Sequence, residues 1–331
     1  MLSKKSKRIL LGMAAAAGAI ALAACSGPAS SSSGGSTPAN GSATSGGPMN
    51  VAVVTHGSAG DSFWNVVKNG ATDAGKQLGV NVTYNSDGDP GAQSKLIDNA
   101  VAQHVDGLVV SMANPDALKT SIQAAVKAGI PVITINSGQS QSAAFGALAH
   151  VGQDEGIAGQ QAGAKLKTAG KTNLLCVIHE AGNVGLAQRC DGAKQGFGKT
   201  TNLQVDINNP TDVEAKIKGA LQTDSSIDAV LTLNPQIALS AVNAAKETNS
   251  KATVATFDLN SDVVSAIKSG QIAFAVDQQQ YEQGYLPIVM LKLYHDNANT
   301  VGGGQPVLTG PGFVDKSNVD KVSQYAARGT R

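Results

Sequence analysis

The chain has 331 residues, and its 25 basic and 24 acidic residues leave a net charge of +1. The basic residues are scattered, whereas a nucleic-acid partner requires a basic face that neutralises several phosphates. Composition therefore argues against nucleic-acid binding, and the length suits one large domain or two lobes.

The N-terminus has the pattern of a bacterial export signal. A charged start at residues 4–8 precedes an apolar run, Ile9–Ala23, that is too short to span a membrane comfortably, since a span needs about 20 residues. The run ends in Leu22-Ala23-Ala24-Cys25, which resembles the lipobox of bacterial lipoproteins, whose cysteine is lipidated and becomes the first mature residue. We predict an exported protein anchored through Cys25 to the outer face of the bacterial membrane, in the periplasm or extracytoplasmic space. A plain signal peptide is the alternative.

Residues 26–48 consist almost wholly of Ser, Gly, Ala, Thr, Pro and Asn. Without large apolar side chains, such a segment cannot bury enough surface to offset the entropy cost of ordering it. We expect a flexible tether that reaches about 25–30 Å, followed by a folded body from about Met49 to Arg331.

The folded body repeats one unit, in which a short β-branched run is followed by a polar turn and an amphipathic helical segment. Helical patterns are clear at Phe63–Leu78 and Pro115–Ala128. The predicted strands are Val51–Thr55, Val80–Tyr84, Gly107–Ser111, Pro131–Ile135, Asn173–His179, Leu203–Ile207, Ala229–Leu233, Thr253–Phe257 and Ala273–Asp277. A short strand is also expected within Gly146–Gly159, a segment that we interpret as a crossover between two halves.

Strands that alternate with helices at this period predict parallel sheets covered by helices on both faces. The strands are continuous apolar runs, as buried parallel strands are. They fit one wide sheet or two smaller ones, and we favour an α/β fold of two lobes, each a doubly wound parallel sheet. Ligands of such sheets bind beyond the carboxyl ends of the strands, so the residues after each strand are the candidates for a binding site.

The chain contains three cysteines. With Cys25 assigned to lipid, Cys176 and Cys190 remain, and an isolated pair in an exported protein is typically bonded. We predict a Cys176–Cys190 disulfide, with two reduced core cysteines as the alternative.

Two adjacent aromatic residues, Phe63 and Trp64, follow the first strand and come shortly after Asp61. Neighbours in a helix cannot both face the same core strip, and Trp64 is the single tryptophan of the chain. Two large rings at a loop-to-helix junction suit stacking against the apolar face of a flat ligand such as a sugar ring. Ordinary core packing of either ring is the alternative.

Neutral amides and carboxylates follow other strands. They are Asn136 with Ser137 beside it, Asn234, Asp258 and Gln278. Asn and Asp before a helix are also common N-caps, but their recurrence at equivalent strand ends favours a polyhydroxylated ligand, because these groups bond hydroxyls in fixed geometry. Arg189, in a later helical segment, has a guanidinium fork suited to two hydroxyls or ring oxygens. A surface arginine is the alternative there.

Enzyme motifs are absent from the sequence. It has no Walker loop, no G-x-G-x-x-G after a strand and no G-x-S-x-G elbow. His179-Glu180 is not followed by the second histidine that a zinc-protease helix requires. The five histidines of the chain are scattered rather than clustered as metal ligands. We expect no catalysis, no metal site and no cofactor.

Five motifs in the same order resemble those of the ribose-type periplasmic binding proteins, the substrate-binding components of sugar ABC transporters. They are Asp61–Trp64, Gly129–Thr134, Arg189–Gly192, Phe257–Asp258 and Asp277–Tyr285, and the resemblance covers about Met49–Phe313. It implies the type I periplasmic binding fold, whose two lobes are joined by three crossovers and close over a sugar like a hinge. It also implies an N-terminal lobe of residues 49–152 and 279–306 and a C-terminal lobe of residues 153–278 and 307–331.

The resemblance assigns roles in the C-terminal lobe and at the hinge. Arg189 and Asp258 resemble the charged pair that holds adjacent hydroxyls. Asn234 and Gln278 resemble the amide ligands near the hinge.

In the N-terminal lobe, Phe63 and Trp64 resemble the stacking rings of the family, and Asp61 resembles the polar residue before them. Asn136 stands where ribose binders have an aspartate, and Ser137 where they have the neighbouring arginine. The aromatic residue that usually sandwiches the ring from the second lobe is missing around residues 209–212. These departures favour a different sugar or an acyclic polyol over ribose.

The leading interpretation is a membrane-tethered monomer that binds a monosaccharide or small polyol between its lobes and delivers it to the transmembrane subunits of an ABC permease. The alternative is a same-fold receptor that presents a small diffusible signal to a sensor partner. A transcription regulator of related fold would need an N-terminal helix-turn-helix, which the signal and tether replace here. An exported hydrolase is disfavoured by the missing motifs.

Overall fold

The computed structural model of the protein describes residues 47–58 and 60–331. The predicted export signal, the lipidation site Cys25 and nearly all of the predicted tether lie outside the described residues. Within the described ranges, no helix combines the length and apolar character needed to cross a bilayer.

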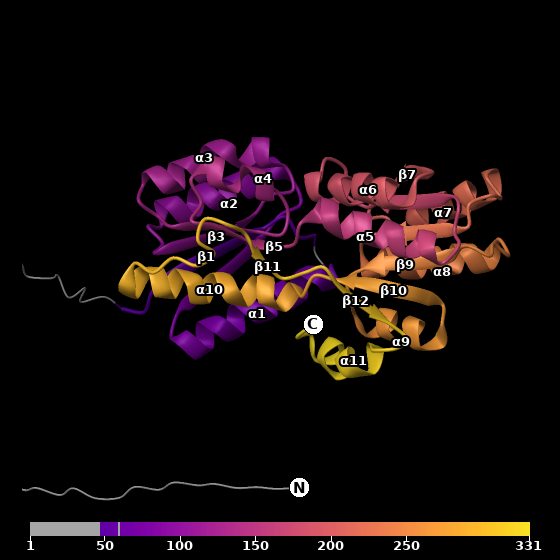
Figure 1. The fold of residues 1–331 in the computed structure, drawn as a ribbon. Coiled ribbons are helices and arrows are strands. Elements are labelled where there is room, and N and C mark those ends of the chain that lie inside the picture. Colours follow the sequence, from indigo (N-terminus) through magenta and orange to yellow (C-terminus); the bar gives the residue numbers. More distant parts are fainter. Residues whose placement is uncertain (1–46, 59) are drawn as a thin grey trace, which may run out of the picture. The chain divides into compact units, whose positions relative to one another are not determined.

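Two six-stranded sheets organise the described residues (Figure 1). The first sheet has the order β11 (Val307–Leu308), β5 (Ala149–Gly152), β4 (Val132–Ile135), β3 (Gly107–Ser111), β1 (Asn50–Thr55) and β2 (Asn81–Ser86). The second has the order β12 (Gly312–Asp315), β10 (Ile272–Asp277), β9 (Thr253–Phe257), β8 (Ala229–Thr232), β6 (Leu174–Ile178) and β7 (Thr200–Gln204). The prediction of two doubly wound α/β lobes, rather than one wide sheet, is confirmed.

Helices cover both faces of the first sheet, because its strands are apolar on both sides. One face packs against α1 (Ser62–Leu78) and α10 (Gln280–Asn297), which contribute Val67 and Leu291 to the core. The other face packs against α2 (Pro90–Ala102) and α3 (Pro115–Lys127). The short α4 (Gln139–Ser142) and a 3₁₀ turn (Ala143–Phe145) follow β4.

The second sheet is covered in the same way. One face packs against α5 (Glu155–Thr168) and α6 (Val184–Phe197). The other packs against α7 (Pro210–Thr223), α8 (Pro235–Glu247), α9 (Ser261–Ser269) and α11 (Val319–Arg328). We refer to the first sheet with its helices as the N-terminal lobe and to the second as the C-terminal lobe.

The chain passes between the sheets three times: from β5 to α5, from β10 to α10, and from β11 to β12. The expected lobe boundary at residue 307 is wrong, because Val307 and Leu308 pair in parallel with β5 of the N-terminal lobe. The final strand β12 runs antiparallel to β10, so the second sheet is not purely parallel as predicted. A strand that enters directly from the third crossover, without a helix, reaches the sheet edge in the opposite direction.

The predicted strand Leu203–Ile207 is displaced, since β7 spans Thr200–Gln204. β7 is an edge strand whose polar first residues face solvent, and it pairs with β6 alone. The apolar residues further on leave the strand and pack Val205 into the core. Hydrophobicity therefore marked the end of this strand rather than its centre.

Pairs of helices approach unusually closely in each lobe through glycine. A Cβ atom at Gly284 of α10 would lie 1.9 Å from the carbonyl oxygen of Val67 in α1. In the C-terminal lobe, a Cβ atom at Gly159 of α5 would lie 2.0 Å from the carbonyl oxygen of Arg189 in α6. Only glycine permits this backbone contact.

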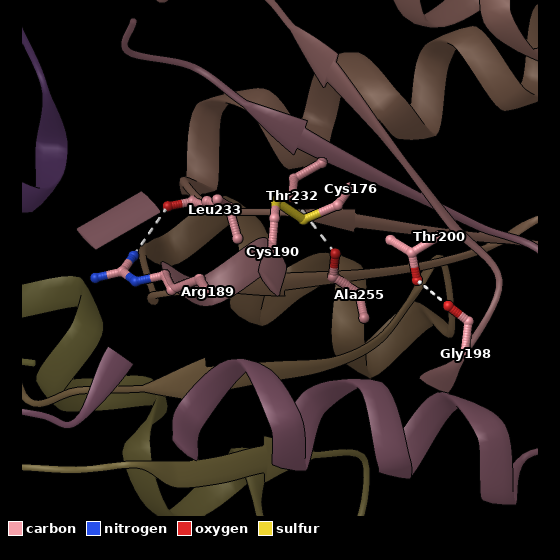
Figure 2. Close-up of a disulfide and its surroundings, with 8 residues drawn as sticks. All are labelled: Cys176, Arg189, Cys190, Gly198, Thr200, Thr232, Leu233 and Ala255. Carbon is pink, nitrogen blue, oxygen red and sulfur yellow. Dashed lines mark hydrogen bonds between the residues drawn. A yellow bond between two sulfur atoms is a disulfide. The ribbon is translucent and has the colours of Figure 1, made fainter. Parts of the chain in front are cut away.

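The predicted disulfide is present. Cys176 in β6 is bonded to Cys190 in α6, with the Cα atoms 5.9 Å apart (Figure 2). It ties α6 to the sheet beneath it, one residue from Arg189.

Candidate functional site

A cavity with an empty volume of about 280 Å³ lies between the two lobes, at the carboxyl ends of their strands. Its wall is formed by His56, Asp61, Phe63, Trp64, Asn136, His179, Glu180, Asn183, Leu186, Arg189, Leu233, Asn234, Asp258 and Gln278. A larger hollow of about 1000 Å³ adjoins it and shares His56, His179, Glu180 and Asn183. We call the first cavity the cleft site.

The aromatic wall of the cleft site comes from the N-terminal lobe. The ring of Trp64 meets Phe63 edge-on at 4.9 Å between centroids and meets His56 edge-on at 4.6 Å. Gly57 makes room for this ring, because a Cβ atom there would lie 2.4 Å from the Trp64 side chain. Both aromatic residues line the cavity and also pack in the core of the lobe, while stacking against a ligand stays a prediction.

Asp61 begins α1 and contacts the other lobe. Its Oδ1 atom accepts a hydrogen bond from the Phe63 backbone N–H at 2.9 Å, as an N-cap does. The Asn234 side-chain amide donates to the two Asp61 carboxylate oxygens at 3.3 and 3.4 Å. Burial raises the pKa of Asp61 to about 6, although both hydrogen bonds act to lower it. The carboxylate is thus partly desolvated and placed where both lobes meet.

Amides join the lobes near the crossovers. The Asn136 amide donates to Gln278 Oε1 at 3.2 Å and to Gln283 Oε1 at 3.3 Å, and its backbone is left-handed, with φ of 60°. Ser137 lies beside the cavity rather than on its wall. Its hydroxyl donates to Asn136 Oδ1 at 3.1 Å and to Asn183 Oδ1 at 3.2 Å. Ser137 therefore links side chains that line the site.

Arg189 is buried, not on the surface, and points into the cleft site from α6. Its guanidinium lies over the Phe257 ring, 4.6 Å from the centroid. Its Nη1 atom is 3.5 Å from the Leu233 carbonyl oxygen (Figure 2). Among the described residues, the carboxylate in ion-pair contact with it is Glu155. Sequence reasoning did not identify Glu155, and the role of Arg189 and Asp258 in holding adjacent hydroxyls stays a prediction.

Asp258 follows β9 and also has left-handed backbone, with φ of 69°. The Gln278 amide donates to its Oδ1 atom at 2.8 Å. Burial raises the pKa of Asp258 to about 8, even though the charge of Arg189 and the Gln278 hydrogen bond act to lower it. A carboxyl group that is this poorly solvated gains from any hydroxyl that donates to it.

Four further polar residues on the wall were not predicted from the sequence: His56, His179, Glu180 and Asn183. Asn183 caps α6 through its Oδ1 atom, while its amide donates to Glu180 Oε2 at 2.7 Å and lies 3.4 Å from His56 Nε2 in the other lobe. The signal was available for three of them, because His56 directly follows β1 and the His179–Glu180 pair directly follows β6. The rule that ligands bind beyond strand ends applies to them equally.

The two histidines of the wall are buried and neutral. Burial lowers the pKa of His56 to about 3 and that of His179 to about 4. The Nδ1 atom of His179 is buried and has no hydrogen-bond partner among the described residues. It is a further polar atom on the wall, able to bond a hydroxyl group.

Taken together, the wall offers aromatic faces from the N-terminal lobe, carboxyl and amide groups from both lobes, and one guanidinium from the C-terminal lobe. Such a set can hold a small molecule with an apolar ring face and several hydroxyls. Within residues 47–58 and 60–331, no three His, Cys, Asp or Glu side chains are grouped to hold a metal ion.

Comparisons with known proteins agree with this geometry. Residues 51–298 match the family described as periplasmic binding protein domain. A carbohydrate transporter from Acidothermus cellulolyticus 11B, solved in complex with myo-inositol, is 43% identical with a TM-score of 0.85, and the match covers 86% of this chain and 100% of that chain. The ribose import binding protein RbsB of Haemophilus influenzae is 26% identical over 236 residues, which are 69% of this chain and 79% of that protein.

A periplasmic ribose ABC transporter structure from Conexibacter woesei DSM 14684 has the same fold, with 24% identity and a TM-score of 0.70 over 84% of this chain and 95% of that chain. The family match spans most of the folded body and every residue of the cleft-site wall, whereas β11 and β12 lie beyond it. The chain therefore belongs to the periplasmic binding protein family, whose members bind solutes and are not enzymes.

Proposed function

We propose that this protein is the substrate-binding lipoprotein of a carbohydrate ABC importer, and that its cleft site binds a cyclitol such as myo-inositol. The lobes close over the ligand at the crossovers, and the protein, a monomer, delivers it to the permease. The observation that carries the proposal is the cleft site itself, with Trp64 on one wall and Arg189 and Asp258 on the other.

The chemistry of the wall supports a neutral polyol. Carboxylates accept hydrogen bonds from hydroxyls, and amides both accept and donate them. The replacement of an Asp-Arg pair by Asn136 and Ser137 removes charge from the N-terminal wall relative to ribose binders. The 43% identical Acidothermus protein, solved with myo-inositol, supports a cyclitol in particular.

Calorimetric titration tests the proposal. Myo-inositol, D-ribose and D-glucose are titrated into the purified protein, and the emission of Trp64, the single tryptophan, is followed in parallel. Myo-inositol should bind at one site per chain, more tightly than ribose, and should shift the tryptophan emission. A chain that binds ribose more tightly, or none of the three, would contradict the proposal.

The anchor is tested separately, because Cys25 lies outside the described residues. Cys25→Ala should release the protein from the membrane fraction or leave the precursor unprocessed. Fractionation and intact mass of the wild-type and variant proteins measure this. Unchanged membrane retention together with an unchanged processed mass would rule out lipidation at Cys25.

A further inference from the structure

Glu155 and Arg189 form a buried ion pair directly beneath the cleft site. The Arg189 Nε atom donates to Glu155 Oε2 at 2.6 Å, and Nη2 donates to Oε1 at 2.8 Å, a bidentate geometry. The two residues are only 4% and 3% exposed. Burial alone would lower the pKa of the Arg189 guanidinium, but the Glu155 carboxylate raises it overall. The arginine therefore stays charged while its charge is matched on one edge.

The backbone holds this pair rigidly. Glu155 is the first residue of α5, and Arg189 lies on α6. The backbones of these two helices are in close contact at Gly159 and Gly192. The disulfide at Cys190 fixes α6 to β6. The Gln153 amide, from the first crossover, donates to Glu155 Oε2 at 2.9 Å. These contacts fix the backbones that carry the two partners relative to each other.

One edge of the guanidinium is left for the cleft. Glu155 occupies the Nε and Nη2 edge, and Phe257 covers one face. Nη1 has a long contact with the Leu233 carbonyl oxygen, at 3.5 Å. Asp258, whose charge also acts on Arg189, keeps its own hydrogen bond from Gln278. Arg189 and Asp258 therefore have different hydrogen-bond partners, Glu155 and Gln278.

We infer that Glu155 is a positioning and specificity-determining residue, which orients and neutralises Arg189 so that the cleft site accepts neutral polyols and rejects anionic sugars. The inference rests on the proposed function, since it names the ligand charge that the same site selects. The wall carries the carboxyl groups of Asp61, Glu180 and Asp258, and Arg189 is its single arginine or lysine. With that cation matched by Glu155, an anionic ligand meets no unpaired positive charge.

The test compares a neutral and an anionic probe of similar size, myo-inositol and D-glucuronate. In Glu155→Gln the carboxylate is lost while the side-chain size is kept, so Arg189 carries an unmatched charge. We expect the ratio of glucuronate to myo-inositol affinity to rise at least tenfold over wild type, measured by titration calorimetry. Glu247→Gln, which removes an exposed ion-pair partner of Lys218 in the same lobe, should leave the ratio unchanged. An unchanged ratio in Glu155→Gln would overturn the inference.

Glu155→Asp separates charge from geometry and retains a buried carboxylate should Glu155→Gln not fold. The shorter side chain cannot keep both short contacts, so myo-inositol should bind at least threefold more weakly while glucuronate is still rejected. Full myo-inositol affinity in this variant would overturn the positioning role. Glucuronate binding by this variant would overturn the charge-selecting role.

A ligand-free measurement keeps the inference separate from the proposed function. In a double-mutant cycle of Glu155→Gln and Arg189→Gln, unfolding in urea should show the double variant to be more stable than at least one single variant, because it leaves no lone buried charge. If wild type does not bind myo-inositol, the proposed function fails, and the cycle still decides the pairing. Additive effects in the cycle would overturn the positioning role.

Discussion

The two lobes share one strand order, yet they present different chemistry to the cleft site. The N-terminal lobe contributes its rings, Phe63 and Trp64, which are held by ordinary core packing. The C-terminal lobe contributes Arg189 and Asp258, and Arg189 lies on a helix fixed by a disulfide and is held in a buried ion pair. The difference teaches that buried charges need a stiffer support than apolar rings, because a misplaced charge loses its compensating partners.

Removal of the disulfide should have the largest effect on this contrast. The double variant Cys176→Ala/Cys190→Ala opens a loop of 14 residues and should lose about 3 kcal/mol in free energy of unfolding. Urea denaturation measures the loss. Reductant should destabilise wild type by a similar amount and leave the variant unchanged. A variant as stable as oxidised wild type would show that the disulfide does not stabilise the C-terminal lobe.

The buried His150 should make the N-terminal lobe sensitive to acid. Burial lowers the pKa of this histidine from 6.5 to about 4, and its Nδ1 lies 3.0 Å from the Thr134 hydroxyl. Between these pH values the unfolded chain binds a proton that the folded chain does not. Stability attributable to His150 is therefore complete above pH 6.5 and declines as the pH falls toward 4, by up to about 1.4 kcal/mol per pH unit.

His150→Gln should flatten this decline, so that wild type loses up to about 2.7 kcal/mol more than the variant between pH 6.5 and 4.5. Asp61 and Asp258, whose pKa values are raised, give stability the opposite pH dependence. They contribute equally to both proteins, so their effect cancels in the difference between wild type and variant. Urea denaturation at several pH values measures the difference. His104→Gln, at an exposed position, should follow wild type. Parallel profiles for all three proteins would refute a buried neutral His150.

In the C-terminal lobe, Asp258→Asn should separate binding from stability. The affinity for myo-inositol should fall at least tenfold, about 1.4 kcal/mol, because hydroxyls that donate to Asp258 stabilise its ionised form, whereas the amide cannot ionise. Stability at pH 7 to 8 should not fall, because the raised pKa means that folding is penalised as the pH rises from about 4 to about 8. Asp262→Asn, at an exposed position on α9, is the control. Unchanged affinity would remove Asp258 from the site.

Trp64→Phe should have the smallest effect. An aromatic face remains, so the affinity should fall about two- to tenfold, given that aromatic contacts contribute about 0.5–1.5 kcal/mol. Titration calorimetry is the measurement, since the variant has no tryptophan signal. Tyr325→Leu, at an exposed aromatic residue of α11, should bind as wild type does. A loss of a hundredfold or more would mean that the N-terminal wall, not the C-terminal one, dominates binding.

The sequence predicted the fold well because the strands are apolar, short and regularly spaced. The rule that ligands bind beyond strand ends also selected residues that line the cleft site in the structure, such as Asp61, Asn136 and Asn234. The same rule applies to His56 and His179, which also follow strands. They were not predicted, because the aromatic and amide residues at strand ends formed the stronger sequence pattern. Whether these residues contact a ligand stays a prediction.

The pairing of Glu155 with Arg189 could not be predicted, since it joins residues 34 positions apart in the sequence. It depends on how closely α5 and α6 pack, and that distance is set by glycines whose role is visible only in three dimensions. The antiparallel β12 escaped prediction for a similar reason, because it is a short edge strand with no helix before it. A local sequence pattern can predict a helix or a strand. Which residues meet across a helix interface depends on how the helices pack in three dimensions.

A crystal structure of the protein with myo-inositol tests the central claim most directly, namely that both lobes bind one neutral polyol between them. We predict the ring between Trp64 and the Arg189–Asp258 wall, with Arg189 bonding the ligand through Nη1 while it keeps its bidentate contact with Glu155. Myo-inositol bound outside the cleft site, or contacting only one lobe, would contradict the account.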